Sequence, residues 1–135
     1  MDAAAAREAD LRDALRGELA QLDSDVLVGI GRALERDRDR LIGGVWGAGD
    51  DGCLLTLAAR ELGYAEGEDL LATSVAAVRV PALFDELWAL ILARSGDAAV
   101  ARSLTHRLVV EALALRPQER SEEAPSATAR IALPR

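Results

Sequence analysis

The amino-acid sequence predicts an all-α protein, a single-domain orthogonal or up-down bundle of about five helices with a central C-terminal helical hairpin. The chain of 135 residues has the length of one domain. Half of its residues are hydrophobic but only 3% are aromatic, so the core must be built from Leu, Val and Ala. Because strands are enriched in aromatic and β-branched residues, this composition favours closely packed helices. Apolar residues also recur at helical spacing along most of the chain.

Caps and helix breakers divide this pattern into separate helices. Asp23 or Ser24 can accept hydrogen bonds from the unpaired N–H groups at the start of the second helix. That helix ends at Gly43–Gly44, which can adopt the left-handed cap, and Gly63 ends the third helix. Pro81 lacks an N–H, so it ends one helical run and begins the next as a first-turn residue. The expected helices are residues 4–22, 24–41, 51–62, 70–80, 81–94 and 98–115.

A tight turn joins the last two helices. Ser95–Gly96–Asp97 supplies a stop, a left-handed turn and a new cap, and the helices on both sides have broad apolar faces. We therefore expect them to form the central antiparallel hairpin. After Pro117 the sequence has no apolar periodicity and is rich in Gln, Glu, Ser, Ala and Pro. The predicted domains are a helical domain at residues 1–116 and a disordered C-terminal tail at residues 117–135.

The residue types exclude several chemistries. The chain has no Lys and no Asn, a bias that suggests GC-rich codons and a bacterial source. Without Lys, Schiff-base and pyridoxal enzymes and the phosphate-binding P-loop are excluded. One Cys and one His cannot form a zinc finger, a CxxC redox pair or a two-histidine metal site. We therefore expect no metal and no cofactor.

The charge and the first residues of the chain predict its partners and its location in the cell. The formal charge is −7, and an acidic surface repels a phosphate backbone, so we expect no nucleic-acid partner. The first residues lack the basic and apolar regions of a signal peptide. No apolar run reaches the roughly 18 residues that a membrane span needs. We expect a cytoplasmic protein without a membrane partner.

Two segments of the second helix resemble binding motifs. Gly29 and Gly31 have the spacing of the turn that approaches a dinucleotide, but Leu34 occupies the third glycine position and no βαβ units follow. We interpret this segment as a helix whose glycines permit close approach of a neighbour. The charges of Arg36–Arg40 alternate in sign, which is typical of a solvated helix face.

The glycine-rich loop from Gly43 to Cys53 is the candidate ligand site. It joins flexible backbone to an aromatic ring, Trp46, and two carboxylates, Asp50 and Asp51. Each feature also has a structural interpretation. Gly43 can cap one helix, Asp51 can cap the next, and Trp46 can cover the core between them.

Cys53 and His106 are the remaining candidates for chemistry. A thiol in the first turn of a helix lies near the positive end of the helix dipole, which favours thiolate. Asp50 and Asp51 oppose this effect, and free Cys is among the most often buried residue types. His106 has neither an orienting carboxylate nor a nucleophile nearby in the sequence, so we interpret it as structural.

These observations favour a small helical interaction or regulatory module without catalysis of its own. The absence of an assembled catalytic set and the broad apolar faces of the last two helices motivate this hypothesis. We expect a homodimer that buries part of the hairpin from Leu83 to Leu115, or another protein partner. The alternatives are a thiol-dependent enzyme or redox sensor centred on Cys53, and small-molecule binding at the Gly43–Cys53 loop.

Overall fold

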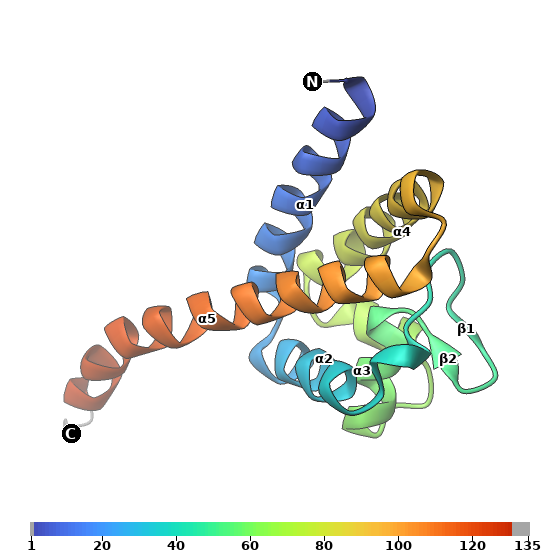
Figure 1. Cartoon of the computed structure of the whole chain (residues 1–135). Helices are drawn as coiled ribbons and strands as arrows, with labels where there is room; N and C mark the ends of the chain where they lie inside the picture. The colour runs from blue at the N-terminus through green and yellow to red at the C-terminus, as the bar shows by residue number, and fades with distance from the viewer. Residues whose placement is uncertain (1, 131–135) are drawn as a thin grey trace.

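The structure, a computed structural model, describes the backbone of residues 2–130 and the side chains of residues 2–115. It confirms the all-α class (Figure 1). Short 3-10 helices η1 and η2 and a small hairpin of strands β1 and β2 accompany the α-helices. The elements are α1 (Ala3–Gln21), α2 (Ser24–Asp37), η1 (Arg38–Arg40), β1 (Gly47–Ala48), β2 (Asp51–Gly52), α3 (Leu54–Leu62), η2 (Gly67–Ala72), α4 (Val75–Ser95) and α5 (Ala98–Arg130).

Helix α1 is the element on which the two longest other helices pack. Asp2 caps it by accepting a hydrogen bond from the N–H of Ala5 at 2.7 Å. Its predicted leucine stripe is confirmed, since Leu11, Leu15 and Leu19 are all buried. The other layer pairs α2 with α3, and α5 lies across α2 (Figure 1).

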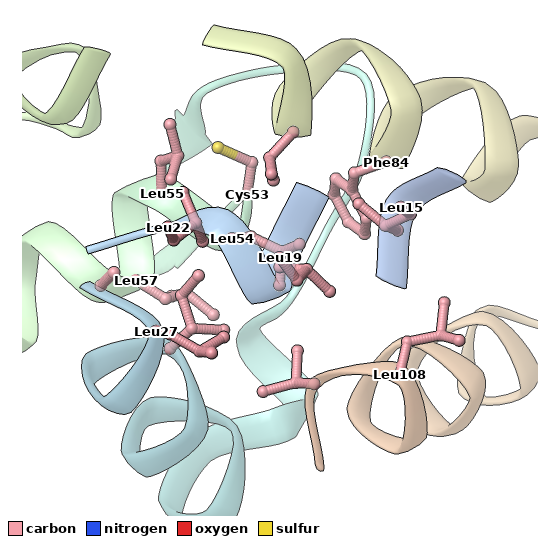
Figure 2. Close-up of a cluster of buried hydrophobic side chains, with 14 of the residues drawn as sticks. Leu15, Leu19, Leu22, Leu27, Cys53, Leu54, Leu55, Leu57, Phe84 and Leu108 are labelled. Carbon is pink, nitrogen blue, oxygen red and sulfur yellow. The ribbon is translucent and has the colours of Figure 1, made fainter. Parts of the chain in front are cut away.

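The core is built mainly from Leu and Ala, as the composition predicts. Every α-helix contributes side chains to it, and Phe84 and Trp88 of α4 are its aromatic members. Figure 2 shows part of this cluster, which includes Leu15, Leu19, Leu22, Leu27, Cys53, Leu54, Leu55, Leu57, Phe84 and Leu108.

Helices α4 and α5 are joined by the predicted tight turn. Gly96 adopts a left-handed conformation at φ 67°, and the carboxylate of Asp97 accepts a hydrogen bond from the N–H of Ala99 at 2.9 Å. The two helices diverge from this turn, and each packs more extensively against α1 than against the other (Figure 1). The hairpin is therefore open, with α1 as the shared neighbour.

The expected break at Pro81 is wrong, because α4 continues through it from Val75 to Ser95. Ser74 caps this helix by accepting a hydrogen bond from the N–H of Ala77 at 3.1 Å. The missing N–H of Pro81 removes one backbone hydrogen bond. Core packing on both sides of Pro81, at Ala77, Val80 and Phe84, holds the two halves of the helix in line.

Helix α2 is shorter than expected, and Gly43 does not cap it. The helix ends at Asp37 and tightens into η1, and the glycine with positive φ is Gly44 at 88°. Gly43 is needed instead for close approach, because a Cβ at this position would lie 2.8 Å from the Cβ of Trp88. The close packing against Trp88 therefore explains why a glycine stands at position 43.

The glycine pair of α2 has the helical role that we expected. Residues 24–37 form a helix, which excludes the strand that a dinucleotide turn requires. A Cβ on Gly29 would lie 3.3 Å from Leu62 Cγ, and one on Gly31 would lie 2.9 Å from Leu113 Cδ1. The two glycines thus let α3 and α5 approach α2 closely.

Helix α5 continues past its expected end at Leu115 to Arg130. Its C-terminal part projects away from the other helices (Figure 1). The boundary between a helical domain and a tail at residue 117 stays a prediction. Residues 131–135 of the predicted tail lie outside the described residues.

An ion pair between Glu8 and Arg94 joins α1 to the end of α4. The Glu8 carboxylate accepts hydrogen bonds from Arg94 Nε at 2.7 Å and Nη2 at 3.1 Å, and Glu8 is only 9% exposed. These hydrogen bonds, opposed in part by burial, lower the pKa of Glu8 from its ordinary value of 4.5. Because the folded pKa is below the unfolded pKa, the pair stabilises the fold above about pH 4.5 and this contribution is lost as the pH falls through the folded pKa.

Replacing Glu8 with Gln should therefore lower the free energy of unfolding by about 1 kcal/mol at pH 7. The difference from the native chain should shrink steadily below about pH 4.5. Chemical denaturation across this pH range measures both. The matched control is Glu86→Gln, which removes the exposed pair with Arg7 between the same two helices and should have a smaller effect. A Glu8→Gln difference that does not change with pH would contradict this account.

Candidate functional site

The Gly43–Cys53 loop forms a short β-hairpin between η1 and α3 (Figure 1). Strands β1 and β2 pair antiparallel, with Ala48 opposite Asp51. The N–H of Cys53 also donates to the carbonyl oxygen of Trp46 at 3.1 Å. The segment that we expected to be a flexible loop is therefore organised by backbone pairing.

Arg60 of α3 holds the turn of this hairpin. Its guanidinium donates hydrogen bonds to the carbonyl oxygens of Gly49 at 3.1 Å, of Asp51 at 3.4 Å and of Asp50. A charged donor shared by three carbonyl groups satisfies backbone acceptors that strand pairing leaves open. The sequence does not predict this role, because nothing in it connects Arg60 with a turn about ten positions earlier.

The structure does not bring the four predicted site residues together. Trp46 is 38% exposed and lines a small groove of about 180 Å³ beside residues 65–68. Asp50 is exposed and forms an ion pair with Arg40 at 3.3 Å. Asp51 lines a larger cavity on another side of the hairpin, and Cys53 is buried in the core. These residues therefore point to different places and form no common pocket.

Two structural roles that we expected in this loop are wrong. The N-cap of α3 is Cys53, without a side-chain cap hydrogen bond, whereas Asp51 belongs to β2 and so does not cap the helix. Asp50 lies in the turn and does not cap it either. Trp46 is too exposed to cover the core, which is the role of Trp88 at 8% exposure.

An open bowl of about 820 Å³ lies between the end of α2, η1, Asp51 and α5. Two of its three arginines pair with neighbouring carboxylates. Arg36 pairs with Glu61 and with Asp37, and Arg40 lies 4.0 Å from Asp37. The bowl is consistent with the solvated, charge-balanced helix face that the alternating sequence predicts.

His106 lines this bowl and contacts Arg38. Its Nδ1 lies 3.0 Å from Arg38 Nη1. Because a guanidinium can only donate, Nδ1 must accept, which assigns the ring hydrogen to Nε2. Nε2 is buried and has no hydrogen-bond partner among the described residues. The contact orients the imidazole toward η1 and supplies no carboxylate that would make it a general base.

The described part of the chain assembles no catalytic set at these positions. The Sγ atom of Cys53 lies 3.6 Å from Thr56 Oγ1 and is buried among leucines (Figure 2). Among side chains of residues 2–115, no group of three or more His, Cys, Asp or Glu could hold a metal ion. Between residues 2 and 130, none of the helices is long and apolar enough to cross a bilayer.

The burial of Cys53 predicts a slow thiol. At 4% exposure, its sulfur can meet a reagent only when the protein opens locally or unfolds. We expect a thiol reagent at neutral pH to label the native chain at least about 100-fold more slowly than the chain in denaturant, since opening of a core site costs several kcal/mol. Labelling of the native protein at the rate of the unfolded chain would instead support a reactive thiol.

Exposed apolar side chains gather on the outer face of α4. Val75 and Val78 are 68% and 57% exposed, which makes them the most exposed of the large hydrophobic residues described. Ala82 and Ala89 are also exposed and follow at helical spacing on the same side of α4. Single exposed apolar residues are ordinary, but several on one helix face are typical of a contact surface.

Comparison with protein-family models, with characterised proteins and with solved structures finds no match to this chain. No function is therefore transferred from another protein.

Proposed function

We propose that this protein is a small, non-catalytic interaction module that self-associates, with two copies meeting through the outer face of α4. One observation carries the proposal, the exposure of Val75 and Val78 on that face. Two β-branched side chains held out into water are an unfavourable arrangement that burial against a second copy would relieve.

The geometry of α4 fits an antiparallel pair of identical helices. Val75, Val78, Ala82 and Ala89 are spaced by three, four and seven residues, so they form one seam along the helix. Small residues near the middle of the seam allow two backbones to approach closely. A two-fold axis near Ala82 would place Val75 of one copy opposite Ala89 of the other.

The charges beside the seam are complementary in the same arrangement. Arg79 lies three residues before Ala82, and Asp85 lies three residues after it. In an antiparallel pair centred on Ala82, Arg79 of each copy lies level with Asp85 of the other. In the monomer Arg79 pairs with Glu18 at 3.1 Å and Asp85 accepts a hydrogen bond from the N–H of Gly44 at 2.8 Å, so a contact between copies would have to share or replace these partners.

Most of the apolar surface of α4 and α5 is buried in the core of the monomer. Leu87 and Leu108 are at most 2% exposed, so the core already buries the hairpin surface that we expected at a dimer interface. The proposed contact therefore lies nearer the start of α4. The alternatives have weaker support, because Cys53 is buried and the loop residues do not converge on one pocket.

Mass measurement by light scattering tests this proposal. We expect a particle of twice the chain mass of 14.3 kDa at high concentration. Val75→Arg should weaken the dimer by at least about tenfold, since position 75 faces Ala89 of the other copy and the new charge has no partner there. Val110→Arg is the matched control, because Val110 is 49% exposed on α5 and outside the seam. A mass of 14.3 kDa at every concentration would reject the proposal.

A pair of charge reversals tests the antiparallel arrangement. Arg79→Asp alone and Asp85→Arg alone each place like charges opposite one another in a homodimer. Mixing the two variants restores both opposite-charge contacts, so the mixture should dimerise more strongly than either variant by itself. Equal dimerisation of the mixture and the separate variants would show that these residues do not face one another.

A further inference from the structure

A second groove, separate from the hairpin and from the outer face of α4, lies where α1, the end of α4 and the start of α5 meet. Its volume is about 440 Å³. Arg12 comes from α1, Arg94 from α4 and Arg107 from α5. Residues far apart in the sequence thus gather three guanidinium groups at one place.

The groove is positively charged although the chain carries a formal charge of −7. Glu8 accepts hydrogen bonds from Arg94, and the nearby charge of Arg12 also attracts its carboxylate. Within residues 2–115, Arg107 forms no ion pair or side-chain hydrogen bond. Three arginines thus line the groove beside the one carboxylate of Glu8. In the bowl near η1, by contrast, Arg36, Arg38 and Arg40 are interleaved with Glu35, Asp37, Asp39 and Asp51.

Glu8 also fixes the orientation of Arg94. Its carboxylate occupies Nε and Nη2 of the guanidinium. This leaves Nη1 as a donor that Glu8 does not use, on a side chain that cannot rotate without breaking two hydrogen bonds. A donor held in place by a buried carboxylate loses less conformational entropy when it binds an anion.

The remaining walls suit a ligand with a charged group and an apolar part. Ser103 provides a hydroxyl that can donate or accept, and Val100 and Leu104 provide apolar surface. The groove also lies beside the first turn of α5, where the positive end of a helix dipole favours an anion. Asp97, which caps that turn, offsets part of this effect.

We propose that this groove binds the phosphate group of a small organic phosphate. Guanidinium groups bind phosphate oxygens through paired, charge-assisted hydrogen bonds, and three of them around one groove match the several oxygens of such a group. The volume is that of a small-molecule site, since such pockets measure roughly 300–1,000 Å³.

Calorimetric titration of the full chain with pyrophosphate tests the proposal. We expect saturable binding that weakens with added salt. Arg107→Gln and Arg12→Gln should each weaken binding by about tenfold, because each removes a charge-assisted hydrogen bond to the anion. Arg107 is exposed and Arg12 is half-buried without an ion pair among the described side chains, so melting temperatures should change little.

Arg32→Gln is the matched control. Arg32 is an exposed arginine of α2, outside the groove, and within the described side chains it forms no ion pair. Its replacement should change the affinity less than twofold. An equal loss in this variant would mean nonspecific attraction, and an absence of saturable binding at millimolar pyrophosphate would also overturn the proposal. Citrate is the carboxylate probe, and tighter binding of citrate than of pyrophosphate would overturn the assignment to phosphate.

Discussion

Replacing Leu108 with Ala is expected to lower the free energy of unfolding by about 2–5 kcal/mol. Leu108 is 2% exposed on the inner side of α5 and belongs to the core cluster (Figure 2). Removing three carbon atoms from this position loses apolar burial and leaves a cavity, because the surrounding helices can relax only in part. Urea denaturation of the native chain and the variant measures the difference.

Val110→Ala is the matched control for this prediction. Val110 lies two residues further along α5, but it is 49% exposed and so contributes little to the core. Its truncation should change the free energy of unfolding by less than about 0.5 kcal/mol. Similar losses at the two positions would show that the inner face of α5 is assigned wrongly.

Replacing Trp88 with Ala should cost about 3–5 kcal/mol. Trp88 is 8% exposed, packs against Phe84 with ring centroids 5.7 Å apart, and lies against Gly43. The guanidinium of Arg102 lies 6.0 Å from its ring centroid. The truncation therefore removes an aromatic pair and a cation–π contact together with the largest single block of core surface on α4.

Trp46→Ala is the matched control, because it removes the same type of side chain from an exposed position. Trp46 is 38% exposed on the hairpin, so its loss should cost less than about 1 kcal/mol. Chemical denaturation of the two single variants measures both losses in the free energy of unfolding. A larger loss at Trp46 than at Trp88 would restore the interpretation that Trp46 covers the core.

Local signals predicted the ends of several helices correctly. Gly63 and Gly96 are left-handed residues at helix ends, as their positions in the sequence indicate. Each of these features depends on residues within one turn of the helix, so its physical cause is visible in a short stretch of sequence. The leucine stripe of α1 was predictable for the same reason, because helical periodicity alone places those side chains on one face.

The errors concern residues whose roles depend on distant contacts. Gly43 was expected to cap a helix, but its lack of a Cβ makes room for Trp88 of α4. Pro81 was expected to end a helix, but packing of α4 against the core keeps the helix continuous. In both cases a tertiary contact outweighs a local preference, and a single sequence does not reveal which distant residue supplies it.

The same difference between local signals and distant contacts applies to the candidate site. The sequence indicated that the Gly43–Cys53 segment is unusual, and the structure places a β-hairpin there. It could not indicate that Arg60 binds the turn or that Arg38 contacts His106, which is 68 residues away. Nor could it show that Cys53 is buried in the core whereas the neighbouring Asp50 is exposed and pairs with Arg40.

Disulfide formation by an Ala82→Cys variant tests most directly the claim that two copies meet through α4. The native thiol is first removed by Cys53→Ala, so that the new cysteine is the single reactive site. If a two-fold axis passes near Ala82, the two new thiols face each other within disulfide reach, and mild oxidation should convert most of the protein to a covalent dimer. A Val110→Cys variant in the same background should stay monomeric under these conditions. Absence of a covalent dimer at position 82, or equal yields at positions 82 and 110, would contradict the proposed interface.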